Sequence, residues 1–174
     1  MKKTALILSL AFSLVLLFAA CEQKQIKTQG EEELQLTSPK GFKAANSISE
    51  LKSFIDLNTN DRIISIEYLE SEKANAALIS FVREDNQKKQ TIAIGKGKMH
   101  FESTNLIYKK LSPKNQKAQN GGSWIISCTG TGDCNNCTVQ GTVDADGNLN
   151  FSCSDSCCDM EVKTNNEATY NIGD

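Results

Sequence analysis

The chain of 174 residues contains a single histidine and shows no excess of basic charge. His100 would have to be the base of any Ser-His-Asp or Cys-His catalytic group, and no G-x-S-x-G motif accompanies it, so the sequence does not predict an enzyme. Lysine and arginine number 19 against 21 acidic residues, whereas domains that bind nucleic acids usually carry a strong basic excess. Residues 95–98 are basic and contain glycine but lack the G-x-x-x-x-G-K order of a phosphate loop. We therefore predict neither a nucleic-acid partner nor a cofactor.

A hydrophobic run long enough to span a bilayer is also missing. The apolar run over residues 5–20 is shorter than the roughly 20 residues that a membrane-spanning helix needs. Lys2 and Lys3 precede this run, and the mean hydropathy of the whole chain, −0.36, fits a soluble body. A positively charged start followed by a short apolar run is typical of a cleavable secretory signal.

The residues that follow this run narrow the type of signal. Phe18-Ala19-Ala20-Cys21 places a large apolar residue three positions before a cysteine and two small residues next to the bond that a peptidase would cut. This pattern resembles the lipobox of bacterial lipoproteins, and the resemblance covers residues 1–21 only. It implies that residues 1–20 are a lipoprotein signal peptide and that Cys21 is lipidated. Its acyl chains would anchor the mature protein to a membrane of the bacterial cell envelope, at the outer membrane or the periplasmic face. The alternative is an ordinary secretory signal with a coincidental cysteine.

Cysteine, in contrast to histidine, is well represented in the chain. There are seven, and lipidation of Cys21 leaves six, all between residues 128 and 158. An even number in an exported chain is typical of a disulfide framework, because disulfides persist outside the reducing cytosol. The sequence does not choose among about fifteen connectivities, except that the two adjacent cysteines are expected to reach different elements. The disulfide candidates are Cys128, Cys134, Cys137, Cys153, Cys157 and Cys158.

Zinc is the competing interpretation of the same cysteines. Four of them nearly match the C-x2-C…C-x2-C spacing in which two pairs of thiolates hold one tetrahedral ion, namely Cys134, Cys137, Cys153 and Cys157. The second pair is spaced one residue too far apart, and two cysteines would be left over. We therefore favour disulfides and predict no metal site. Cys134-Asn135-Asn136-Cys137 also has the spacing of thioredoxin-type catalysts, but it lacks the helix that stabilises their reactive thiolate, so we expect a structural role.

Acidic residues gather in the same region, where residues 121–174 carry one lysine and eight acidic side chains. The segment from Asp144 to Asn148 superficially resembles an acidic calcium loop. An EF-hand, however, needs a glutamate at about the twelfth position and helices on both sides, whereas Asp-Gly between alternating segments predicts a hairpin turn. Weak calcium binding stays open for a wider acidic cluster, made of Asp133, Asp144, Asp146, Asp155 and Asp159.

Hydrophobic patterning predicts an α+β fold, with one amphipathic helix on a small antiparallel sheet, followed by a small cysteine-rich β module. The helix should begin at Ser47, because Ser47 and Glu50 have the spacing of a capping box. Its expected apolar face contains Ile48, Leu51, Phe54 and Ile55. The expected strands are residues 62–69, 76–84, 89–95, 98–102, 124–128, 138–143 and 149–153.

Composition divides the mature chain into four parts. Residues 21–45 are expected to be a lipidated flexible tether, because so polar a segment cannot bury enough surface to offset its ordering entropy. Residues 46–108 are expected to form an α+β body that folds on its own, and residues 109–123 a polar linker. Residues 124–174 are the acidic cysteine-rich module with its tail, in which few large apolar side chains make covalent or metal staples necessary.

These features predict a lipid-anchored protein of the cell envelope with a non-enzymatic binding or structural role. Its expected partners are the membrane, through the lipid on Cys21, and a protein or polysaccharide that the sequence does not identify. The alternative function is that of a metal-handling lipoprotein that uses its thiolates or its acidic cluster.

Overall fold

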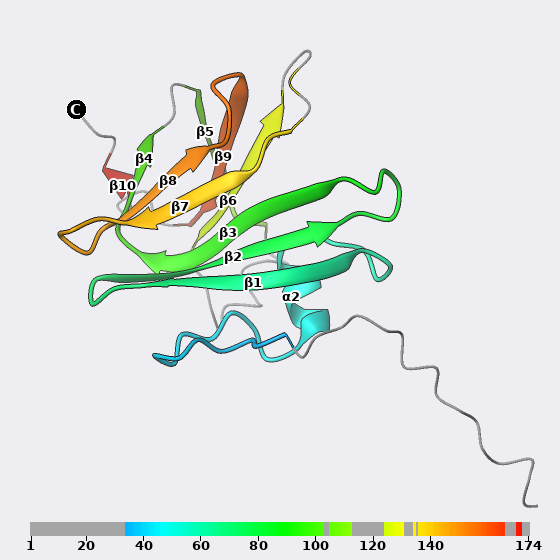
Figure 1. Cartoon of the computed structure of the whole chain (residues 1–174), viewed down its shortest axis with the longest axis horizontal. Helices are drawn as coiled ribbons and strands as arrows, with labels where there is room; N and C mark the ends of the chain where they lie inside the picture. Colours follow the sequence, from blue (N-terminus) through cyan, green and yellow to red (C-terminus); the bar gives the residue numbers. More distant parts are fainter. Residues whose placement is uncertain are drawn as a thin grey trace, which may run out of the picture. The chain divides into compact units, whose positions relative to one another are not determined.

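The computed structural model describes residues 34–102, 105–112, 124–130, 134 and 136–165, together with the backbone of residues 170–171. These residues are mostly β, with one short helix, α2 (Ile48–Phe54) (Figure 1). The strands are β1 (Arg62–Glu70), β2 (Ala74–Val82), β3 (Lys89–Gly97), β4 (Met99–Glu102), β5 (Leu106–Lys110), β6 (Trp124–Gly130), β7 (Val139–Val143), β8 (Leu149–Cys153), β9 (Cys158–Thr164) and β10 (Tyr170–Asn171).

The strands form two sheets. The larger has six strands in the order β1-β2-β3-β6-β9-β5, and the smaller has four in the order β10-β4-β8-β7. Neighbours from β1 to β9 in the larger sheet are antiparallel, as expected, but β5 lies parallel to β9. In the smaller sheet β4 is parallel to both β8 and β10. The prediction of an antiparallel sheet is therefore only partly correct, because β4 and β5 each join a strand that comes much later in the chain.

The helix forms for the local reasons that the sequence indicates. The Ser47 hydroxyl accepts a hydrogen bond from the Glu50 backbone N–H, and the Glu50 carboxylate accepts one from the N–H of Asn46, which satisfies donors at the helix start. Leu51 and Phe54 are buried on its inner face. The predicted helix start is thus confirmed.

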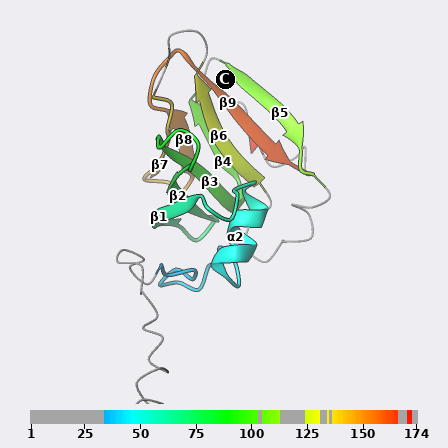
Figure 2. The same cartoon turned by 90° about the vertical axis from the view of Figure 1, so that its right-hand side faces the viewer.

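One face of β1–β3 and β6 in the six-stranded sheet is covered by α2 and by the residues before it (Figure 2). Phe42, Leu51 and Phe54 from this covering layer share one buried cluster with sheet residues such as Ile79 and Ile94. Residues 34–45 are part of the layer: Thr37 and Lys43 form an isolated β-bridge, and the Ser38 hydroxyl accepts a hydrogen bond from the Phe42 N–H. The predicted tether is therefore wrong for residues 34–45, because the aromatic ring of Phe42 gives this polar segment enough apolar surface to pack. Residues 21–33 lie outside the described residues.

The opposite face of β1–β3 and β6 is covered by the four-stranded sheet (Figure 1). Small side chains on β2 and β3, Ala76 and Ala93, leave room there for Trp124, whose ring lies 5.3 Å from that of Phe151 in an edge-on arrangement. The Trp124 ring also passes over Gly95, where an added Cβ would lie 2.5 Å from it. Because both faces of the sheet are covered here, β2, β3 and β6 each contain a short apolar run whose consecutive residues are buried or partly buried, namely residues 76–79, 92–94 and 124–126.

The segments predicted as body and module share both sheets. β6 pairs with β3 on one side and with β9 on the other, and β8 pairs with β4. The start of the predicted linker belongs to β5, and Leu111 is buried, while residues 113–123 lie outside the described residues. The sequence correctly indicates a cysteine-rich C-terminal region, but its strands complete the sheets of the preceding segment.

Candidate functional site

The cysteines of the C-terminal region form three pairs at disulfide distance. The Sγ–Sγ distances are 1.98 Å for Cys128–Cys153, 2.05 Å for Cys134–Cys157 and 2.01 Å for Cys137–Cys158. The adjacent cysteines 157 and 158 reach different partners, as the sequence predicts. Disulfide pairing is thus the arrangement that the structure supports for all six candidates.

One pair joins the two sheets. Cys128 lies in β6 of the larger sheet and Cys153 at the end of β8 in the smaller one. Both side chains are partly buried and pack against the cluster that contains Trp124 and Phe151. This pair therefore fastens the two layers where they already share a core.

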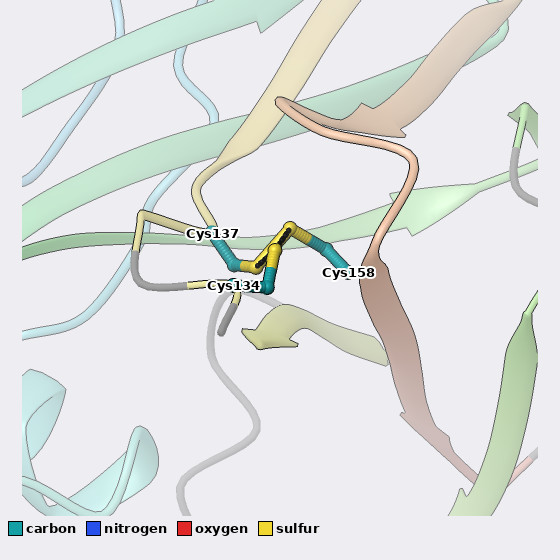
Figure 3. A group of neighbouring side chains, drawn as sticks. All are labelled: Cys134, Cys137 and Cys158. Atoms are coloured by element: carbon teal, nitrogen blue, oxygen red, sulfur yellow. Dashed lines mark hydrogen bonds between the residues drawn. A yellow bond between two sulfur atoms is a disulfide. The ribbon is translucent and has the colours of Figure 1, made fainter. Parts of the chain in front are cut away.

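The other two pairs lie together, and we name Cys134, Cys137, Cys157 and Cys158 the four-cysteine cluster. The Cys134 Sγ atom lies 3.4 Å from Cys137 Sγ and 3.5 Å from Cys158 Sγ, so three sulfur atoms converge on one point (Figure 3). Cys158, the first residue of β9, is buried, whereas Cys157 is exposed. The cluster consequently has one end in the core and one end at the surface.

Backbone contacts fix the cluster on both sides. Gly130 at the end of β6 is in register with Cys158, and a Cβ on this glycine would lie 1.9 Å from the Cys134 carbonyl oxygen. Only glycine allows so close an approach. Ser154 ties the other side, because its hydroxyl donates to the Asn136 carbonyl and accepts from the Thr138 N–H. The sulfur positions thus rest on β6, β9 and the flanks of β7 and β8.

A small open cavity of about 110 Å³ lies against the cluster. Cys134 and Cys137 line it, together with Lys88, which lies just before β3, and Lys89, the first residue of β3. Sequence reasoning missed these lysines, and no local signal could have found them, because they are distant in the chain and reach the cysteines only through the pairing of β3 with β6. They bring positive charge next to an otherwise acidic segment.

The zinc ligands that spacing suggests are only partly brought together. Cys134 and Cys137 share a group with Cys158, whose ligand atoms all lie within 4.8 Å of one another, while Cys153 is paired with Cys128 instead. A second group contains Cys134, Asp155 and Cys157. The spacing along the chain predicts Cys153 as a zinc ligand, whereas the fold places Cys158 beside Cys134 and Cys137. The reason is that the pairing of β6 with β9 determines which cysteine faces the cluster.

The acidic loop is a hairpin turn between β7 and β8. The Asp144 carboxylate accepts hydrogen bonds from the N–H groups of Asp146 and Asn148 and from the side-chain amide of Asn148, and Gly147 has a φ of 77°, which suits glycine. These hydrogen bonds lower the pKa of Asp144 to about 2. The Asp144 carboxylate thus serves to hold the turn together.

The wider acidic cluster is not assembled among the residues that the structure describes. There, Asp144, Asp146 and Asp159 belong to no group of three ligand side chains whose donor atoms lie within 4.8 Å of one another, and Asp133 lies outside this part of the chain. Asp155 lies instead beside Cys134 and Cys157. His100 lies in β4 and joins no such group in the described part of the chain.

Comparison with known proteins adds no family. Neither a protein-family model, nor a curated protein sequence, nor a solved structure matches this chain. Within the described residues no helix is both long and apolar enough to cross a membrane. Cys21 and the rest of the predicted signal lie outside those residues. Function must therefore be argued from the sequence and from the geometry of the described residues.

Proposed function

We propose that the chain is a lipid-anchored protein of the bacterial cell envelope whose β sandwich, locked by disulfides, has a non-enzymatic binding or structural role. The observation that carries this proposal is the pairing of all six C-terminal cysteines at disulfide distance. Such pairing is typical of proteins that mature in an oxidising compartment. It agrees with an N-terminus that resembles a lipoprotein signal.

The pairing also supports a role without catalysis. A cysteine must be a free thiolate to act as a nucleophile, and the pairs consume the sulfur atoms that could do so. Cys128–Cys153 fastens the two sheets, and the other two pairs fasten the start of β9 to the segment between β6 and β7. A sandwich fastened in this way offers a stable surface in an oxidising compartment, where disulfides persist.

The anchor is tested by Cys21→Ser in the full-length protein produced in a bacterium. The unchanged protein should take up labelled fatty acid, partition into a detergent phase and stay with membranes in high salt, because two or more acyl chains anchor stably. Cys21→Ser should lose all three properties. Phe18→Leu is the matched control and should keep them, since it retains a large apolar residue three positions before the cysteine. An unlipidated protein that washes free of membranes without detergent would overturn the anchor.

Metal handling is the second candidate function, and one observation favours it. Cys134 Sγ lies 3.4 Å from Cys137 Sγ and 3.5 Å from Cys158 Sγ, and the last two atoms are at disulfide distance from each other. Three sulfur atoms of the four-cysteine cluster therefore lie close together. Thiolate groups are the ligands that zinc prefers in structural sites.

A further inference from the structure

We propose that the four-cysteine cluster binds one Zn²⁺ ion through four thiolates once its two disulfides are reduced. This inference gives the metal-handling candidate a defined site. It does not depend on the membrane anchor, because the site lies wholly within the described β sandwich. The ligands would be Cys134, Cys137, Cys157 and Cys158.

The spacing of the sulfur atoms is the first argument. A zinc–thiolate bond of about 2.3 Å gives sulfur–sulfur edges of about 3.8 Å in a tetrahedral site. Cys134 Sγ already lies 3.4 Å from Cys137 Sγ and 3.5 Å from Cys158 Sγ. Two edges of the tetrahedron are therefore nearly in place, and rotation of side chains released by reduction can supply the others. Figure 3 shows these three side chains pointing toward one another, Cys134 and Cys137 from the segment between β6 and β7 and Cys158 from the start of β9.

The direction of approach argues for a ligand site over disulfide exchange. Cys134 Sγ is almost equally distant from the two sulfur atoms of the Cys137–Cys158 pair, so it lies beside their bond. Exchange requires a thiolate to attack one sulfur along the axis of the bond that breaks. A position beside the bond is instead the one that a third ligand of a common ion would occupy.

The scaffold of the site does not consist of the two disulfides alone. Cys158 is held in β9 by its pairing with β6, and Ser154 joins the flanks of β7 and β8 by hydrogen bonds. These contacts restrict how far the four sulfur atoms can separate after reduction, and preorganised ligands cost less entropy to bring to a metal.

The charges near the four-cysteine cluster and the exposure of its cysteines also suit a Zn²⁺ ion. Four thiolates around Zn²⁺ leave a net charge of about −2, because each thiolate carries one negative charge. Lys88 and Lys89 line the cavity beside Cys134 and Cys137 and would offset this charge. Cys157 is exposed, which gives a reductant access to its pair, while Cys158 is only 2% exposed, which shields the inner end of the site from water.

The chemistry balances with a phosphine as reductant. Each trialkylphosphine takes one oxygen atom from water, becomes a phosphine oxide and supplies two electrons to one S–S bond, and the two hydrogens of that water end on the two sulfurs. Two such steps give four thiols. Zn²⁺ then forms four Zn–S bonds and releases up to about four protons to buffer, because the metal binds the thiolate form.

Alkylation mapping on the unmodified folded protein tests the proposal. The protein is reduced with a phosphine, the phosphine is removed, about one equivalent of Zn²⁺ is added, and iodoacetamide labelling is mapped by peptide mass spectrometry. Labelling of Cys134, Cys137, Cys157 and Cys158 should slow by at least about tenfold, because a metal-bound thiolate is not free to react. Cys128 and Cys153 should be labelled at the same rate with and without zinc. Unreduced protein is the control and should bind no zinc.

Other labelling patterns overturn the proposal. Protection of Cys153 in place of Cys158 would assign the ion to the ligands that spacing suggests. Equal labelling of all six cysteines, or less than one zinc per chain by native mass spectrometry, would remove the site. All three outcomes leave the proposed membrane anchor untouched, because the experiment uses purified protein without a membrane.

Matched variants locate the ligands independently. Cys134→Ser should weaken zinc affinity by at least about a hundredfold, since it removes the sulfur that both described ligand groups share. The double variant Cys128→Ser/Cys153→Ser removes the one pair that lies outside the four-cysteine cluster and should keep the full affinity for zinc. Asp155→Asn decides whether a carboxylate replaces the exposed cysteine as fourth ligand, and a loss of affinity there would overturn the four-thiolate assignment.

Discussion

A single carboxylate organises the turn between β7 and β8. The two oxygens of Asp144 accept hydrogen bonds from backbone and side-chain N–H groups of the loop, and the loop closes with a backbone hydrogen bond from Gly147 to the Asp144 carbonyl. The same residues that resemble a calcium loop in the sequence thus satisfy one another. At the scale of a residue, such hydrogen bonds limit function, because a carboxylate that already accepts several of them has few free lone pairs with which to bind a metal ion.

The hydrogen bonds of Asp144 predict how stability depends on acid. The pKa of Asp144 is lowered from 3.8 to about 2 in the folded protein, so between these values the unfolded chain binds more protons and stability rises with pH. The contribution of Asp144 should be complete above about pH 5 and should be lost as pH falls toward about 2. Urea denaturation from about pH 6 down to pH 2 measures it.

Two variants separate Asp144 from other acidic groups in this experiment. Asp144→Asn should flatten the pH dependence of the unfolding free energy in the acid range, because it removes the titrating group. Asp146→Asn, two residues away on the exposed part of the same turn, should keep the slope of the unchanged protein. Identical slopes for all three proteins would show that the hydrogen bonds of Asp144 do not stabilise the turn.

At the scale of an element, the cap of α2 is the clearest link between sequence and structure. The helix has only seven residues, and a helix this short gains little from its own propensity, so its cap and its buried face must hold it. Ser47 accepts the hydrogen bond of the Glu50 N–H, whereas Ser49 is an exposed serine within the same helix. The two serines therefore offer a matched comparison.

Ser47→Ala should lower the unfolding free energy by about 1 kcal/mol, because a backbone donor at the helix start loses its acceptor. Ser49→Ala should leave the unfolding free energy within about 0.5 kcal/mol of the unchanged protein, because alanine is the better helix former and no cap is lost. Chemical denaturation of the three proteins under one condition measures both changes. Equal effects of the two substitutions would contradict the assigned cap.

Most individual elements could be predicted from local patterns, and the exceptions have physical causes. The helix and the strands β1–β4 and β6–β8 follow from capping and alternation, although their ends shift by a few residues. β9 was missed even though its buried and partly exposed residues alternate strictly, so Met160 and Val162 carried a usable signal. β5 was missed because it is short and leads into a polar segment, and its place is fixed by pairing with β9.

The composition of the four-cysteine cluster could not be predicted in the same way. Spacing along the chain identifies Cys134 and Cys137 as neighbours, but it cannot show that Cys158 replaces Cys153 beside them. That replacement depends on the register of β6 with β9, which places Gly130 opposite Cys158. Register between strands nearly thirty residues apart is set by the whole core, and no local pattern specifies it.

At the scale of the whole molecule, the segments before and after the predicted linker contribute to the same two hydrophobic cores and do not form separate domains among the described residues. The cluster on the inner face of the four-stranded sheet combines Ala76 and Ala93 from the early segment with Trp124 and Phe151 from the late one. Ile125, from β6, joins the other cluster beneath α2. A change in charge and composition between two segments therefore does not show that they fold separately. Alternating strands from both can complete one sheet.

This arrangement reverses the expectation that residues 46–108 fold on their own. Without β6, the strand β3 loses its hydrogen-bonding neighbour, and the alanine face of β2 and β3 loses the Trp124 and Phe151 rings that cover it. Removing so much buried apolar surface should exceed the marginal stability of a small domain, since about 25 cal/mol is lost per Å². The fragment should show no cooperative thermal transition and should be cut rapidly by protease, whereas residues 34–174 should melt cooperatively under the same oxidising conditions. A cooperative transition in the fragment at a temperature near that of the longer protein would show that the strands of the early segment form a sufficient core without β6.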